Sequence, residues 1–97
     1  MKGFKTVNVF GTECTISISK YENGNTAIQL MDAEDGFPYA VASVNFDEKL
    51  PSGEVYIKDY SENQGIADIL MKEKIISEPI GSRPTGHVVV NKHTLLI

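Results

Sequence analysis

Residues 54–76, EVYIKDYSENQGIADILMKEKII, contain the strongest helix signal in the chain. Ser61 and Gln64 fit a capping box, in which the two side chains satisfy free N–H groups at the start of a helix. Apolar residues then recur at the spacing of one helix face: Ile66, Ile69 and Leu70. We therefore predict a strand at Glu54–Lys58, followed by a short helix that ends near Lys74, with Ile75 and Ile76 packed under its end.

The residues before this stretch alternate between apolar and polar side chains, which is the pattern of half-buried strands. We predict strands at Phe4–Phe10, Glu13–Tyr21, Thr26–Met31 and Phe37–Phe46. In the last of these, Ala40 and Ala42 favour the inward face because small side chains let a helix cross close to the sheet.

Glycines mark the predicted turns between these strands. Gly11-Thr12 fits a two-residue hairpin loop that begins with glycine. Asn23-Gly24 fits a type I′ turn, since both residues tolerate the positive φ that this turn requires. An acidic turn at residues 32–36 ends on a glycine suited to a left-handed conformation.

Two longer segments read as loops. Asp47–Gly53 is charged and then rich in turn residues, and we expect it to be mobile. Glu78–Gly86 contains two prolines and two glycines, so we predict a loop there. A last strand from His87 to Asn91, with a possible extension to Ile97, closes the sheet.

These elements predict an α+β fold, in which an antiparallel β-meander sheet of five to six strands is covered by one short α-helix. The expected order is β-β-β-β-β-α-β. A chain of 97 residues with 41% hydrophobic content suits a single domain over residues 1–97.

Nine basic against thirteen acidic side chains give a net charge of −4, which disfavours non-specific binding to nucleic-acid phosphates. The single cysteine cannot form an internal disulfide, and the first residues lack the apolar stretch of a signal peptide. No apolar run approaches the roughly 20 residues that span a bilayer. We therefore expect a cytoplasmic protein that does not bind membranes.

We expect structural rather than catalytic roles for the cysteine and the two histidines. Cys14 alternates with Ile16 and Ile18, so we predict that it packs in the core. His87 and His93 would lie about 20 Å apart along one strand, too far to share a metal ion. We expect both histidines on the surface of an edge strand.

The acidic clusters and the glycine-bounded loop also lack the spacing of known sites. Residues 32–36 do not have the ligand pattern of a calcium loop. Two carboxylate pairs could serve acid–base chemistry in principle, but solvated loops and a helix cap are the favoured explanation: Asp47 with Glu48, and Asp59 with Glu62. Gly81–Gly86 lacks the glycine-to-lysine spacing of a P-loop. We therefore expect no enzymatic activity, no cofactor and no metal site.

One predicted surface combines aromatic and basic side chains. Tyr56, Lys58 and Tyr60 alternate with the inward residues of their strand, so we expect them to point outward. Together with Arg83 they form the candidate interaction surface. Such a surface suits a protein partner, single-stranded nucleic acid, or an ordinary exposed sheet face.

Three segments carry a resemblance to known proteins: YENGNTAIQL at 21–30, PYAVASVN at 38–45, and IKDYSEN at 57–63 with the helix after it. In these the chain resembles short uncharacterised proteins of bacterial phages, plasmids and other mobile elements. The resemblance implies a glycine near the end of the helix, where this sequence has Glu73 and Lys74.

The resemblance also implies a biological setting. It favours a non-enzymatic accessory protein that binds a host protein in the bacterial cytoplasm, with inhibition of a host defence system such as CRISPR or restriction as one role. The alternatives are a single-stranded nucleic-acid-binding module and a small hydrolase. The identity of the partner, the choice between monomer and homodimer, and whether the last strand pairs within the chain or across a dimer all stay open.

Overall fold

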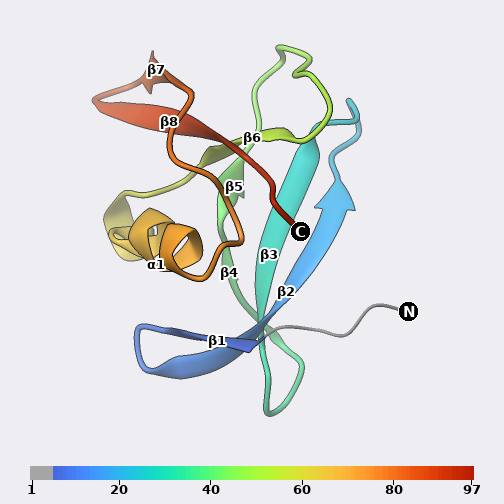
Figure 1. Ribbon diagram of the computed structural model, residues 1–97, viewed down its shortest axis with the longest axis vertical. Coiled ribbons are helices and arrows are strands. Elements are labelled where there is room, and N and C mark those ends of the chain that lie inside the picture. Colours follow the sequence, from blue (N-terminus) through green and yellow to red (C-terminus); the bar gives the residue numbers. More distant parts are fainter. Residues whose placement is uncertain (1–5) are drawn as a thin grey trace.

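The computed structural model describes residues 6–97, whose strands form two antiparallel sheets (Figure 1). The first sheet contains β1 (Thr6–Val9), β2 (Thr12–Lys20), β3 (Thr26–Asp32) and β4 (Pro38–Val41), in that order. The second has the order β5-β6-β8-β7, with bounds β5 (Ser43–Val44), β6 (Glu54–Ile57), β7 (Gly81–Thr85) and β8 (Val88–Thr94). The 3-10 helix η1 (Ser61–Asn63) and the α-helix α1 (Ile66–Lys72) connect β6 to β7.

The α+β character is thus confirmed, but the prediction of one sheet with five to six strands is wrong, because there are two sheets of four strands. The predicted strand Phe37–Phe46 breaks at Ala42. The Ala42 N–H donates to the Ile28 carbonyl in the first sheet at 2.9 Å. The Ala42 carbonyl accepts the N–H of Lys58, the residue directly after β6 of the second sheet, at 2.7 Å. The chain therefore leaves one sheet and enters the other within a single residue.

The main core lies between the two sheets and α1. Its fully buried members come from both sheets, from α1 and from the segment after α1; they include Val7, Val9, Cys14, Ile28, Leu30, Ala42, Val55, Ile57, Ile66, Leu70, Ile75 and Ile76. The predicted inward positions Ile28, Leu30, Val55 and Ile57 are confirmed, as is the packing of Ile75 and Ile76 beside the helix. Burying such side chains contributes roughly 1.5–3 kcal/mol each.

A second, smaller cluster lies on the opposite face of the second sheet. Leu50, Tyr56 and Val90 are buried there, with partly buried apolar neighbours that pack against them: Val44, Phe46 and Tyr60. Leu50 comes from the predicted mobile loop, and the Asn25 side chain anchors this segment by accepting the Leu50 N–H at 2.9 Å. The loop thus covers a sheet face that the alternation of side chains predicts to be exposed.

Both predicted hairpin turns differ in detail. Val9 pairs with Thr12, so the first loop is Phe10-Gly11, with φ angles of 52° and 90°, one residue before the predicted position. In the second, Gly24 has a positive φ and Asn23 does not. Hydrogen bonds across this loop match a type I turn followed by a left-handed glycine. The predicted start of the first strand, Phe4, lies outside the described residues.

The predicted loop Glu78–Gly86 contains a strand. Residues 81–85 form β7, which pairs along its length with β8. Pro84 lacks an N–H group, but β7 is an edge strand with one side unpaired, where proline is tolerated. The predicted last strand is present as β8, and it lies inside the sheet between β6 and β7.

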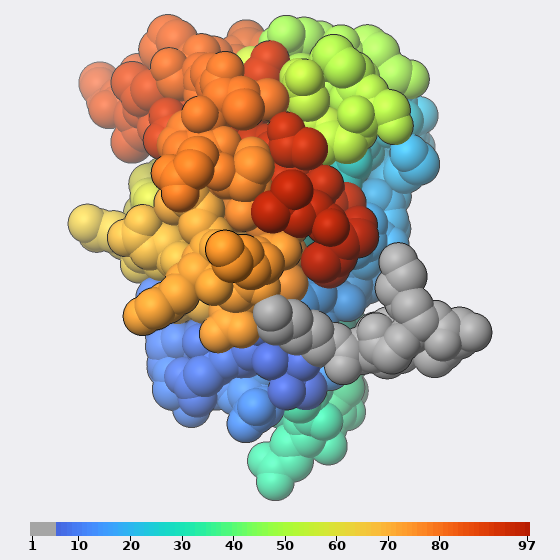
Figure 2. Space-filling view, viewed as in Figure 1, coloured from blue at the N-terminus to red at the C-terminus, as the bar shows by residue number. Residues whose placement is uncertain are grey.

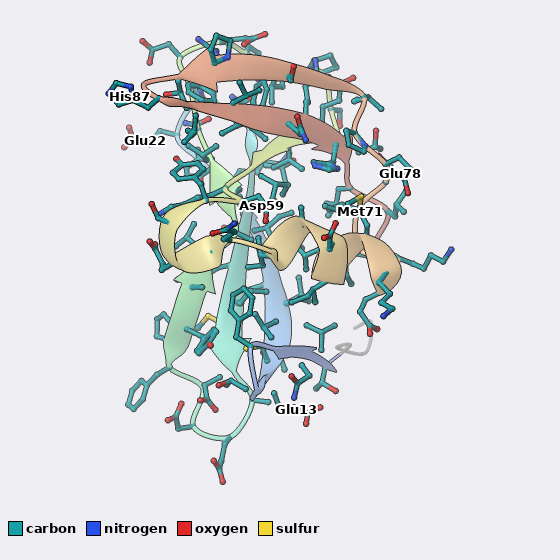
Figure 3. The ribbon with its side chains drawn as sticks, turned by 90° about the vertical axis from the view of Figure 1, so that its left-hand side faces the viewer. Glu13, Glu22, Asp59, Met71, Glu78 and His87 are labelled. Carbon is teal, nitrogen blue, oxygen red and sulfur yellow. The ribbon has the colours of Figure 1, made fainter. Side chains whose placement is uncertain are left out.

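The start of the helix does not use the predicted capping box. Ser61 lies in η1 with a φ of 56°, and no side chain caps η1. Asp59 instead accepts the N–H groups of Gly65 at 2.8 Å and Ala67 at 3.1 Å through one carboxylate oxygen. Asp59 therefore satisfies free N–H groups at the start of α1, where negative charge is favoured (Figure 3).

α1 ends at Lys72, two residues before the predicted end near Lys74, and the backbone conformation that follows it favours glycine. The Ile75 N–H donates to the Leu70 carbonyl at 2.9 Å, and the Lys74 N–H donates to the Met71 carbonyl at 3.0 Å. These two bonds form a Schellman motif, which places Lys74 at the position with a left-handed backbone, with a φ of 63°. α1 is too short for a transmembrane segment, and no other helix within residues 6–97 has the length and apolar character to cross a bilayer.

We expect Asp59→Ala to lower the free energy of unfolding by about 1–2 kcal/mol, because it leaves N–H groups of the first helical turn without an acceptor. Chemical denaturation measures the change. Asp68→Ala is the matched control, since Asp68 is an exposed acid of the same turn. Equal losses for the two variants would contradict this account of the cap.

We expect Lys74→Gly to raise the free energy of unfolding by up to about 1 kcal/mol, because glycine adopts a positive φ without steric cost. The Lys74 side chain is exposed, so its removal loses little packing. Lys74→Val should instead be destabilising, since a branched side chain resists this conformation. Thermal or urea unfolding measures the stability of the two variants. A valine variant that is more stable than the glycine variant would contradict the expectation.

Candidate interaction surfaces

Tyr56, the centre of the predicted aromatic surface, is buried. Its exposed fraction is 5%, so the prediction that it points outward is wrong. Its ring meets the Phe46 ring edge to face, with centroids 5.2 Å apart and planes at 89°. The strand alternates as predicted, but both faces of β6 are covered, one by the main core and the other by the second cluster.

The other predicted surface residues, Lys58, Tyr60 and Arg83, are half-buried around this cluster. Lys58 Nζ lies 5.7 Å from the centre of the Tyr60 ring, and the Arg83 guanidinium lies 4.0 Å from the centre of the Phe46 ring. Such cation–π contacts contribute about 0.5–1 kcal/mol at exposed sites. Lys58, Tyr60 and Arg83 thus lie together, and they form a layer that packs over the second cluster.

Carboxylates neutralise the cations of this layer. Lys58 Nζ lies 2.7 Å from Glu62, and an Arg83 nitrogen lies 2.9 Å from Glu48. The hydrogen bond between Lys58 and Glu62 raises the pKa of Lys58 and lowers the pKa of Glu62. Because the Tyr56 ring is buried and both cations are paired, this face lacks the exposed rings and unpaired cations that nucleic-acid stacking uses.

Cys14 packs in the core as predicted. It is fully buried, and its thiol lies 3.6 Å from the Thr12 carbonyl. Burial raises the pKa of the Cys14 thiol, and the Asp32 and Glu13 carboxylates raise it further. These influences favour the neutral thiol, whereas a nucleophile requires the thiolate.

The two histidines have different environments. His87 is exposed at the outer end of the β7–β8 hairpin, as predicted (Figure 3). His93 has an exposed fraction of 1%, so its predicted place on the surface is wrong. Its Nδ1 lies 2.8 Å from the Ser77 carbonyl and therefore carries the hydrogen, because a carbonyl can only accept. The segment after α1 covers His93 by pairing with the end of β8.

The predicted carboxylate pairs have separate structural contacts. Glu48 binds Arg83, Glu62 binds Lys58, and Asp59 binds the start of α1. Within residues 6–97 no group of three or more histidine, cysteine or acidic side chains is placed to hold a metal ion.

A second surface, which the sequence analysis does not predict, lies on the first sheet. Four large apolar side chains on β4, in the turn before it and in the β1–β2 turn are exposed by 38–69%, and we call them the edge patch: Phe10, Phe37, Tyr39 and Val41. Phe37, at 69%, is the most exposed of the large apolar side chains in the described residues. Exposed apolar groups that cluster in this way mark interaction sites.

Contacts between distant segments bring the edge patch together. The Tyr39 hydroxyl donates to the Val9 carbonyl at 3.3 Å, which links β4 to the end of β1 beside Phe10. The Asn63 amide donates to the Val41 carbonyl at 2.8 Å. A side-chain carbon added at Gly65 would lie 3.8 Å from the Phe10 ring, so the ring lies beside the start of α1.

Acidic residues border the edge patch on one side. Glu34 and Asp35 belong to the turn before Phe37, and the Asp35 carboxylate accepts the Phe37 N–H at 2.9 Å. The Ala33 N–H donates to the Glu13 carbonyl at 2.9 Å, which places Glu13 beside this turn. Across residues 6–97 these three carboxylates have no ion-pair partner.

The sequence carries a weak signal for the edge patch. Phe10 and Phe37 each stand next to a turn glycine, where an aromatic side chain has few neighbours to cover it. Val41 alternates with Ala40 and Ala42, and the choice of the alanine face as inward leaves Val41 outward. Sequence alone does not reveal that folding links these residues.

Comparison of the chain with protein-family models, with curated proteins and with solved structures found no match. The resemblance to mobile-element proteins therefore stays a prediction.

We expect Tyr56→Ala to lower the free energy of unfolding by about 3 kcal/mol, because it leaves a cavity in the second cluster. Val89→Ala should change it by less than about 0.5 kcal/mol, since Val89 is 64% exposed. Urea unfolding of both variants measures the difference. A Tyr56 variant as stable as the Val89 variant would contradict the structural role of Tyr56.

Proposed function

We propose that this chain is a non-enzymatic accessory protein of a bacterial mobile element, and that it binds a host protein through the edge patch. Inhibition of a host defence system such as CRISPR or restriction is the role to test first. The setting comes from the sequence resemblance, and the mode of binding comes from the exposed side chains. The proposal replaces the predicted Tyr56 surface with a different face of the molecule.

The single observation that carries the proposal is the exposure of three aromatic rings and a valine on β4 and on the turns linked to it. Aromatic side chains are enriched at the centre of protein interfaces because they bury a large area for little loss of conformational entropy. Phe37 is the best anchor, since its hydrogen bond with Asp35 fixes the backbone that presents the ring. Such an anchor would fill an apolar pocket on the partner.

The charge around the edge patch indicates the chemistry of the partner. Glu13, Glu34 and Asp35 are exposed beside it, and the whole chain has a net charge of −4. A partner with a basic rim around an apolar pocket would be attracted by this field and would associate faster at low salt. Proteins that handle nucleic acid present basic surfaces of this kind.

A site-specific crosslink tests the proposal. A photoreactive phenylalanine analogue at position 37, in the full chain expressed in a bacterial host, should capture one host protein that can be identified by mass spectrometry. Binding of that purified protein should weaken at least tenfold in a Phe37→Ser/Val41→Ser double variant, because the loss of two buried apolar anchors costs more than 1.4 kcal/mol.

Val89→Ser is the matched control, because Val89 is equally apolar and exposed but lies on β8 in the other sheet. It should bind the partner as tightly as the natural chain does, and raising the salt should slow association. A partner whose affinity is unchanged by the double variant, or the capture of no host protein from position 37, would count against the proposal.

A further inference from the structure

A small pocket lies at the opposite end of β2 from Phe10. It has a volume of about 120 Å³ and is lined by the turn between β2 and β3 and by the end of the loop before β6: Lys20, Gly24, Asn25, Thr26, Lys49, Leu50, Pro51, Ser52 and Gly53. Figure 2 shows these two segments, blue and yellow-green, in contact at the upper right of the molecule. No acidic residue lines this pocket, although the chain has a net charge of −4.

Two lysines line the pocket. Lys20 pairs with Thr26 in the register of β2 and β3, so their side chains leave the sheet on the same side. Lys49 lies across the turn, where a side-chain carbon added at Gly24 would be 2.8 Å from its Nζ atom. Neither lysine has an ion-pair partner in the part of the chain that the structure describes.

Buried polar groups form the floor of the pocket. The Asn25 side chain is fully used, since its amide donates to Asn45 and to the Glu48 carbonyl while its oxygen accepts the Leu50 N–H. The Asn25 side chain thereby joins the β2–β3 turn to the loop before β6. Unlike the Asn25 side chain, the Thr26 hydroxyl has no hydrogen-bond partner among residues 6–97, although the residue is only 9% exposed.

The size of the pocket limits the ligand. A volume of about 120 Å³ suits a small ligand such as a tetrahedral oxyanion. Nucleotides and drug-sized molecules need about 300 Å³ or more. Lysine binds phosphate oxygens as a point charge, and a threonine hydroxyl can add a directed hydrogen bond.

We propose that Lys20, Lys49 and Thr26 form a binding site for a phosphate group, taken either as the free ion or as the end of a larger molecule. The site is independent of the proposed partner patch. The two sites share no residue, and Phe10 and Lys20 lie at opposite ends of β2. Either proposal can therefore fail without the other.

Titration of the full chain with inorganic phosphate tests the site, with amide chemical shifts as the readout and sodium chloride at equal ionic strength as the reference. Saturable shifts of Gly24, Thr26 and Gly53 are expected with phosphate and not with chloride. A capped phosphoserine peptide forms the second arm. Binding of both probes assigns a phosphate group on a larger molecule, and binding of inorganic phosphate alone assigns the free ion.

Substitutions separate a built site from general attraction to positive charge. Lys20→Gln and Lys49→Gln should each weaken phosphate binding at least fivefold, and Thr26→Val should weaken it at least threefold with little change in shape. Lys72→Gln is the control, because Lys72 is an exposed lysine of α1 away from the pocket. Shifts no larger than those in chloride, or equal affinity in all four variants, would overturn the proposal.

Discussion

The division of the Ala42 backbone between two sheets is the constraint on which the rest of the structure depends. Its N–H bonds to β3 and its carbonyl bonds to the chain after β6. The next residue reinforces the corner, because the Ser43 hydroxyl accepts the Ile28 N–H at 2.9 Å and lies 2.8 Å from the Tyr21 hydroxyl. A side chain larger than alanine at this fully buried position would push the sheets apart.

The corner determines which faces of the sheets are covered. It turns the second sheet across the end of the first, so that α1 and the segment after it fill the space between them (Figure 1). The outer face of the second sheet is then covered by the loop that Asn25 anchors. At the β4 edge of the first sheet, Asn63 of η1 bonds the Val41 carbonyl, but the side chains of the edge patch stay exposed. The two proposed sites are therefore both consequences of where this corner places the loops.

Much of the fold could be predicted from local patterns, because those patterns act between near neighbours. The alternation in β2, β3 and β6 identified their inward residues, and the spacing of Ile66, Ile69 and Leu70 identified the helix. The predictions were wrong where a contact with a distant part of the chain replaced the predicted local contact. Asp59 took the place of the predicted cap at Ser61, and pairing with β8 turned a proline-containing loop into β7. Local patterns do not predict the edge patch for the same reason, since contacts between β1, β4 and η1 link its parts.

The sequence by itself determined the α+β class, the core of the strands and helix, and the buried position of Cys14, because side-chain periodicity and hydrophobicity decide these within a few residues. The tertiary structure decided that there are two sheets, that the helix segment 54–76 is capped from Asp59, and that Tyr56 and His93 are buried. It also decided which apolar and basic groups stay exposed. The physical reason is that periodicity distinguishes one face of a strand from the other, whereas burial depends on whether a distant segment covers that face.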